Sequence, residues 1–186
     1  MITFKLIEKD RAARLEHDID AQRRDALVIG PMQQRVFNID ISKFEYCIPK
    51  SEEQLEGLII YVYTPVMLAL EKLRAICQQT EEYYLLVKSR PPAPRARDFF
   101  DIYVISQACS MDITLPQHIE LLRAIFSAKS VPLELLLGIE KYREFHRNDF
   151  LSVKAVIIPG FEIYDYDYYF DFVVDTCRRL HSLGIV

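Results

Sequence analysis

The first third of the chain has the hydrophobic pattern of strands separated by polar segments. Residues 2–8 and 36–41 alternate apolar and polar side chains, which is typical of a half-buried strand. Residues 58–63 form an unbroken run of β-branched and aromatic side chains, which predicts a buried strand. Residues 9–29 are rich in charge and have only weak helical periodicity.

The rest of the chain has the pattern of helices. Thr64 and Pro65 mark a helix start, as N-cap and first helical residue, and this helix should extend to about Gln79. A proline- and arginine-rich loop is expected over residues 88–97. Further helices are expected over roughly 96–110, after Leu115-Pro116, after Val131-Pro132, and over about 167–183 with Gly184 as the C′ glycine. Because strands precede helices instead of alternating with them, the pattern predicts an α+β fold.

Composition narrows the class of protein. The 186 residues suit one ordinary domain, alone or with a small appendage, and 51% hydrophobic residues supply a core. The net charge of −4 disfavours a protein that coats nucleic acid through a wholly basic surface. Only five glycines are present, so a glycine-built phosphate loop is hard to form.

The cysteine pattern and the hydropathy indicate the cellular compartment in which the protein is expected. Cys47, Cys77, Cys109 and Cys177 are scattered singly, which predicts reduced and mostly buried thiols in a cytoplasmic protein. No window approaches the ~20 apolar residues of a membrane span. The four histidines are far apart and none begins a metal-binding signature, so each is expected to be a surface or core residue.

One lysine stands out in the helix expected after Pro65. Lys72 is four residues from both Leu68 and Ile76, at the border of the apolar face. Its side chain must either extend to solvent or direct its ammonium at an anion. The alternative is an ordinary amphipathic core helix with a lysine at its edge.

A second motif spans residues 95–103, Arg-Ala-Arg-Asp-Phe-Phe-Asp-Ile-Tyr. Asp98 and Asp101 are three residues apart and share a helix face, next to Arg95 and Arg97. The helix dipole explains an acid in the first turn, and a solvated salt-bridge cluster is the alternative. Residues 72–97 contain six bases and two acids, so this segment is the best place for a nucleotide or RNA to bind.

A third feature is Asp40, between Ile39 and Ile41 in an expected strand. Asn38 and Ser42 are also polar, so this strand face avoids the core. It is either a solvated face or a carboxylate in a cleft, where Mg²⁺ prefers oxygen ligands.

In this order, these stretches resemble the AbiEii/AbiGii toxin family, nucleotidyltransferase-like proteins of the polymerase-beta type from bacterial toxin–antitoxin and abortive-infection systems. The matching stretches are residues 37–42, 44–47, 63–75 and 95–103. The resemblance implies a partial nucleotidyltransferase-like mixed sheet in residues 1–64. A helical region with the lysine and the Asp-x-x-Asp motif follows over residues 65–186.

The resemblance also implies roles for individual residues. Asp40 would bind Mg²⁺ or help to deprotonate the acceptor, and Lys72 would contact the triphosphate or the transition state. Asp98 and Asp101 would lie near the active site. The residues expected to take part are Asp40, Lys72, Asp98 and Asp101 in catalysis, Lys72, Arg74, Arg95 and Arg97 in nucleotide binding, and Asp40 in metal binding. The implied partners are a nucleoside triphosphate, an RNA or protein acceptor, and a cognate antitoxin.

The sequence departs from the family at its early motifs, a Gly-Gly or Gly-Ser turn followed by a strand Asp-x-Asp. None of the five glycines has a glycine or serine beside it. Asp18-Ile-Asp20 lies among charged residues and favours a solvated helix or loop. We therefore expect a shortened or split nucleotidyltransferase, whose missing motifs come from another segment or chain. The alternative is a non-catalytic interaction module that retains the second half of the fold.

Overall fold

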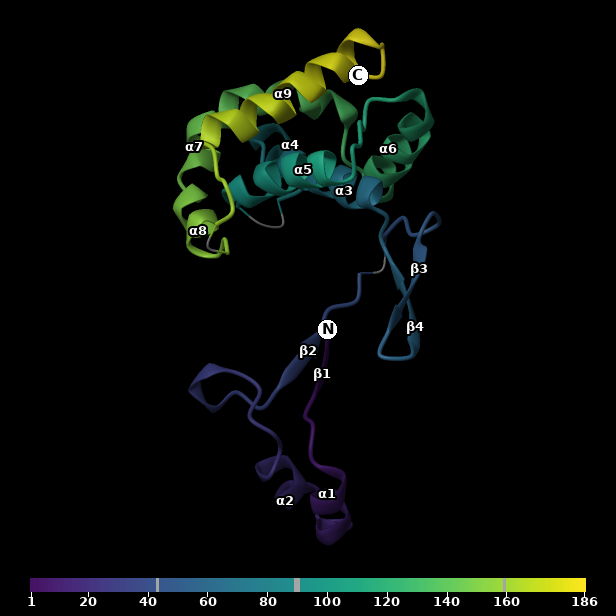
Figure 1. Ribbon diagram of the computed structural model, residues 1–186, viewed down its shortest axis with the longest axis vertical. Coiled ribbons are helices and arrows are strands. Elements are labelled where there is room, and N and C mark those ends of the chain that lie inside the picture. The colour runs from purple at the N-terminus through teal and green to yellow at the C-terminus, as the bar shows by residue number, and fades with distance from the viewer. Residues whose placement is uncertain (43, 89–90, 159) are drawn as a thin grey trace. The chain divides into compact units, whose positions relative to one another are not determined.

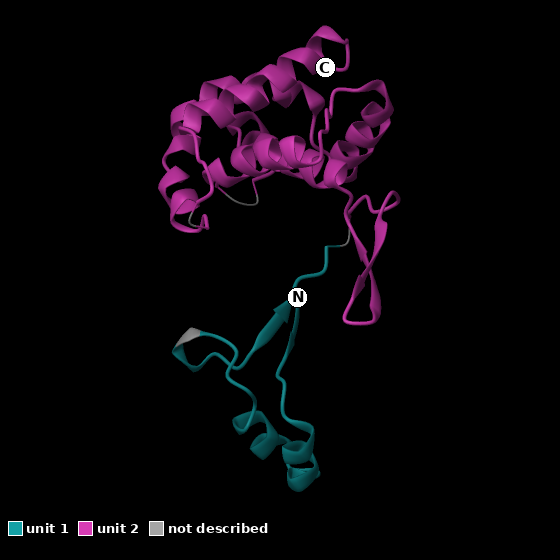
Figure 2. Cartoon of the chain, viewed as in Figure 1, with its two compact units in different colours: residues 1–43 teal, residues 44–186 magenta. Residues whose placement is uncertain are grey.

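The computed structural model describes residues 1–42, 44–88, 91–158 and 160–186, arranged in two compact units, Met1–Lys43 and Phe44–Val186 (Figure 2). Strands lie in the first third and helices follow, so the predicted α+β class is confirmed. The last strand ends at Val62, and a long helix begins at Pro65. The compact units divide earlier, after residue 43.

Unit 1 contains two short strands and two short helices. Strand β1 (Ile2–Phe4) pairs antiparallel with β2 (Phe37–Ile39), and the rings of Phe4 and Phe37 stack with centroids 5.4 Å apart. Both strands are shorter than the alternating patterns predicted. The remaining elements are α1 (Lys9–Leu15), α2 (Ile19–Arg24) and a 3₁₀ turn, η1 (Pro31–Gln33).

The Asp-x-Asp at residues 18–20 is the start of helix α2. The Asp18 side chain accepts a hydrogen bond from the Ala21 amide at 2.9 Å, and Asp20 pairs with Arg23 at 3.4 Å. Both aspartates are exposed. The expected solvated helix is therefore confirmed.

Unit 2 begins with a hairpin of β3 (Ser51–Leu55) and β4 (Leu58–Val62). Its two-residue turn, Glu56-Gly57, has positive φ at both positions, which matches the twist of the strands. The strand over residues 58–63 is thus confirmed, but its predicted burial is wrong. Leu58 and Ile59 are 70% and 68% exposed, because the hairpin is a separate two-stranded sheet with neither face in the core.

The helical body follows the hairpin. In order, its elements are α3 (Pro65–Cys77), α4 (Glu81–Leu86), α5 (Ala96–Ala108), α6 (Pro116–Ala128), η2 (Leu133–Tyr142), α7 (Arg143–Arg147), α8 (Phe150–Ala155) and α9 (Tyr166–Ser182). Helix α5 packs against both α3 and α9 (Figure 1). The core consists of apolar side chains from Met67 to Leu180.

Helix boundaries follow the signals in the sequence. The Thr64 hydroxyl accepts the Met67 amide at 3.3 Å, with Pro65 as the first residue of α3. After α9, Gly184 has φ +70°, and its amide and that of Ile185 donate to the carbonyls of His181 and Leu180. Of the loop expected over residues 88–97, residues 89 and 90 lie outside the described part of the chain.

The four cysteines are free thiols. Cys77 and Cys177 are buried, but Cys47 and Cys109 are exposed, so the expectation of mostly buried thiols holds for only two of them. In the described residues, no helix combines the length and the apolar character that crossing a membrane requires.

Candidate functional site

Helices α3 and α5 bring a lysine and two aspartates together. The Lys72 ammonium donates hydrogen bonds to Asp98 Oδ1 at 3.0 Å and to Asp101 Oδ2 at 2.6 Å. The two aspartates are nearly one helical turn apart, so their carboxylates project from one face and hold the ammonium between them. The lysine at the edge of the apolar face thus directs its charge at anions, one of the two arrangements the sequence allows.

Two arginines complete this group. The Arg95 guanidinium donates to Asp98 Oδ2 at 3.0 Å, and Arg97 Nε lies 3.6 Å from Asp101 Oδ2. We call these five residues, Lys72, Arg95, Arg97, Asp98 and Asp101, the Lys72 cluster. It has three cations and two anions, hence a formal charge of +1, and it lies at the N-terminal end of α5, where the helix dipole adds positive potential.

The electrostatics of the cluster keep the lysine charged. Burial by itself would lower the pKa of Lys72, but its hydrogen bonds to Asp101 and Asp98 and their negative charges outweigh burial and raise that pKa. The Asp98 side chain is 11% exposed, so its ion pair is less screened by water than a surface pair. Lys72 is therefore a permanent cation at neutral pH.

Arg74 is held on α3 by its own neighbours. Its guanidinium donates to Glu71 Oε2 at 2.9 and 2.6 Å and to the Gln78 side-chain oxygen at 2.6 Å. The Gln78 amide in turn donates to the Tyr83 hydroxyl at 2.9 Å. Arg74 is only 8% exposed, so these contacts brace the helix, and its contact with a nucleotide stays a prediction.

A shallow pocket of about 300 Å³ opens beside the cluster. Its charged lining comprises Glu45, Glu71, Lys72, Arg74, Arg95 and Asp98. The volume is at the lower end of the range for small-molecule sites. The pocket therefore places Lys72 and Arg95 where part of an anionic ligand can reach them.

A histidine that the sequence did not single out supports this region. His146 on α7 is buried, and its Nδ1 accepts the backbone N–H of Arg95 at 3.0 Å. Burial, together with the positive charge of Arg95, lowers the pKa of His146 to about 4, so the ring is neutral at pH 7. The two residues are 51 positions apart, and no local motif connects them.

Asp40 lies in the other compact unit. It follows β2 directly and is exposed, whereas the Lys72 cluster lies entirely in unit 2. In the described ranges, no group of three or more His, Cys, Asp or Glu side chains could hold a metal ion, and both cluster carboxylates face cations. These residues therefore do not fit a Mg²⁺ site, and the role of Asp40 as a ligand stays a prediction.

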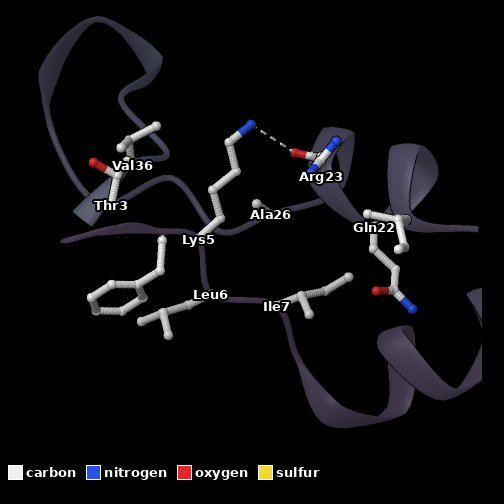
Figure 3. Close-up of a pocket in the computed structure, with 10 residues that line it drawn as sticks. Thr3, Lys5, Leu6, Ile7, Gln22, Arg23, Ala26 and Val36 are labelled. Atoms are coloured by element: carbon white, nitrogen blue, oxygen red, sulfur yellow. Dashed lines mark hydrogen bonds between the residues drawn. The ribbon is translucent and has the colours of Figure 1, made fainter. Parts of the chain in front are cut away.

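A larger pocket, of about 390 Å³, lies in unit 1 beside β1 and α2. The Lys5 ammonium reaches across it to the Arg23 carbonyl at 3.2 Å (Figure 3). Arg35 similarly donates to the Arg24 carbonyl at 3.0 Å. These cations bind carbonyls at the C-terminal end of α2, where positive charge stabilises a helix. Their contacts explain local folding, so the unit 2 pocket is the stronger candidate for chemistry.

Comparison with known proteins identifies the family of the chain. A family model described as "Nucleotidyl transferase AbiEii toxin, Type IV TA system" matches residues 3–171. No curated protein and no solved structure matches the chain. The match covers both compact units and includes every residue of the Lys72 cluster. The chain belongs to the AbiEii family of nucleotidyl transferase toxins of type IV toxin–antitoxin systems.

Proposed function

We propose that the Lys72 cluster binds the triphosphate of a nucleoside triphosphate and supports transfer of the nucleotide to an RNA or protein acceptor in the bacterial cytoplasm. The observation that carries this proposal is the Lys72 ammonium held between Asp98 and Asp101 at 3.0 and 2.6 Å. A cognate antitoxin would counteract the activity, in keeping with the family.

The chemistry requires positive charge at defined positions. An acceptor hydroxyl gives its proton to a base and forms a bond to the α-phosphorus, the bond from that phosphorus to the bridging oxygen breaks, and pyrophosphate leaves with the negative charge. Pre-positioned cations stabilise this developing charge. Lys72 would exchange one carboxylate for a phosphate oxygen while the other keeps its ammonium in place. The Arg95 and Arg97 side chains are 43% and 65% exposed, so their guanidinium groups can reach phosphates.

The resemblance to the family is the reason to expect Mg²⁺. Because the described residues form no metal site, we derive no step through Mg²⁺. Neither a Gly-Gly nor a Gly-Ser turn occurs in the 186 residues. We therefore propose that activity also requires strand carboxylates from outside these residues, with Asp40 as a further ligand or a base for the acceptor hydroxyl.

Nucleotide binding tests the cluster without requiring turnover. Each of the four nucleoside triphosphates would be titrated against the whole chain by calorimetry, with and without Mg²⁺. Lys72→Ala should weaken binding by about tenfold or more, because it removes a charge-assisted contact to phosphate. The matched control is Lys141→Ala, which removes an exposed lysine on η2.

Two further measurements separate the possible outcomes. Induced expression together with a chain that supplies the early motifs should arrest bacterial growth, and Lys72→Ala should relieve the arrest. In the presence of that chain, labelled nucleotide should be incorporated into RNA or protein with the unaltered chain and not with Lys72→Ala. If Lys72→Ala and Lys141→Ala bind the triphosphates equally well, the Lys72 cluster is not the nucleotide site. Nucleotide binding without incorporation, even with a chain that supplies the early motifs, would favour the non-catalytic interaction module.

A further inference from the structure

Helix α5 starts in an unusual way. Its N-cap residue is Arg95, whose side chain makes no capping hydrogen bond. Three residues later, at the third helical position, stands Asp98. An acidic side chain at this position commonly turns back to accept the amide of the N-cap residue, as in a capping box. That local bond would draw the Asp98 carboxylate toward the Arg95 backbone.

The structure shows a different division of partners. Asp98 Oδ1 accepts from Lys72 at 3.0 Å, and Oδ2 accepts from the Arg95 guanidinium at 3.0 Å. The Arg95 amide donates instead to His146 Nδ1, also at 3.0 Å. A residue from a distant helix therefore takes the bond that the third helical position commonly makes.

We propose that His146 is a positioning residue of the site: it satisfies the Arg95 amide from α7 and so leaves the Asp98 carboxylate directed at Lys72. The significance for nucleotide transfer rests on the proposed function. The positioning itself is a property of the folded chain and does not depend on it.

The hydrogen-bond chemistry fixes the state of the ring. A backbone amide only donates, so Nδ1 must be the unprotonated nitrogen and Nε2 must carry the proton. In the described part of the chain, Nε2 is buried and has no partner. Leaving a polar group unpaired is unfavourable, and an apolar side chain would avoid it. The bond to Arg95 is thus the specific contribution of a histidine here.

Packing holds the ring in this orientation. His146 is 1% exposed, and its ring centroid lies 5.1 Å from that of Phe99 and 5.0 Å from that of Phe145. Phe99 follows Asp98 in α5, so the same contact couples α7 to the helix that carries the carboxylate. His146 therefore fixes both the start of α5 and its side-chain packing.

Two substitutions separate the hydrogen bond from the packing. His146→Asn keeps an acceptor oxygen near the position of Nδ1, whereas His146→Leu fills the space without an acceptor. Phe145→Leu is the matched packing control, since it reduces the ring contact and leaves the bond. All three would be made in the full chain and studied by NMR without nucleotide.

The readouts are the hydrogen exchange of the Arg95 amide and the ¹⁵Nζ signal of Lys72. His146→Leu should speed exchange at Arg95 by about fivefold to tenfold, because the amide loses its buried acceptor. The same variant should shift the Lys72 signal, because the Asp98 carboxylate moves away from Lys72 toward the solvent-accessible amide. His146→Asn should restore both, and Phe145→Leu should leave the Lys72 signal in place. If His146→Leu does not fold, the proposal is tested by His146→Asn and by the ring tautomer of the unaltered chain.

An Nδ1–H tautomer in the unaltered chain would overturn the proposal. So would a Lys72 signal that is unchanged in a folded His146→Leu, or that moves equally in Phe145→Leu. Since no readout uses a nucleotide, absence of nucleotide binding would refute the proposed function and leave this result standing.

Discussion

Unit 1 and the helical body begin their helices by the same local rules but differ in what the helices pack against. In unit 1, Asp18 caps α2, yet neither α1 nor α2 has a buried residue. Among the described residues of that unit, Ala26 is the single buried apolar residue. In the body, Thr64 caps α3, which buries seven residues, and α9 buries eight.

The difference shows that a helix signal and a stable helix are separate matters. Helices of six or seven residues are too short to be stable in water alone, and most helix stability in proteins comes from packing an apolar face. Helix α2 has a capping signal, but neither helix of unit 1 buries a side chain against a core. Matched substitutions in the two regions should therefore have very unequal effects on the free energy of unfolding.

The largest difference is expected for a phenylalanine. Phe99 is fully buried and stacks on Phe170 with ring centroids 5.0 Å apart, so Phe99→Ala should cost about 3–5 kcal/mol through the cavity it leaves. Phe4 in unit 1 is only partly buried, and Phe4→Ala should cost less than about 1 kcal/mol. Urea denaturation measures both. Similar costs would show that unit 1 packs as tightly as the body.

The next effect is a loss of stability in acid. The folded pKa of His146 is about 4, against 6.5 for the free side chain, because of burial and the charge of Arg95 and despite Asp98. Between these values the unfolded chain binds the proton and the folded chain does not. Stability should therefore fall by about 3 kcal/mol as the pH drops from 6.5 to 4.

Unfolding free energies of the unaltered chain and His146→Asn across this range isolate that contribution. His17→Asn, which replaces an exposed histidine of unit 1 in the same way, is the matched control variant. An identical pH profile for His146→Asn would contradict the assignment.

Ion pairs provide the third comparison. Lys72→Met leaves two partly buried carboxylates with less compensation and should cost about 1–3 kcal/mol. Arg11 pairs with Asp25 in unit 1 at 2.8 Å, but its side chain is 58% exposed, so Arg11→Met should cause no measurable change. Thermal unfolding in low and high salt checks both. Equal salt sensitivity would argue against the special position of Lys72.

The helix caps should show the smallest effect. Thr64→Ala removes the bond to the Met67 amide and should cost about 1 kcal/mol, because α3 is part of the core. Asp18→Ala removes the equivalent bond in α2 and should lower helix content without changing global unfolding. Circular dichroism and urea denaturation distinguish the two. A global cost for Asp18→Ala would mean that α2 is coupled to the core.

The sequence predicted those parts of the fold that depend on neighbouring residues. The start of α3 at Thr64-Pro65, the start of α6 at Pro116 and the glycine end of α9 are all correct, since each signal acts within one turn of helix. Strand β3 was missed because its residues are polar, although Glu56-Gly57 resembles a hairpin turn and could have indicated it.

Burial was less predictable than local conformation. The side chains of residues 58–62 favour a strand wherever they lie, and the strand is present. Whether such a strand is covered depends on what packs against it, and the hairpin remains outside the core. Burial of a cysteine likewise depends on what packs against it, and Cys47 and Cys109 are exposed.

For the candidate site, the sequence by itself determined that Asp98 and Asp101 share a helix face and that Lys72 lies at the edge of an apolar one, because helical periodicity sets both. Only the tertiary structure decided that these faces meet and that His146 binds the Arg95 amide. Packing of α3 and α7 against α5 creates those contacts across 26 to 51 residues, and no local pattern encodes distances of that length.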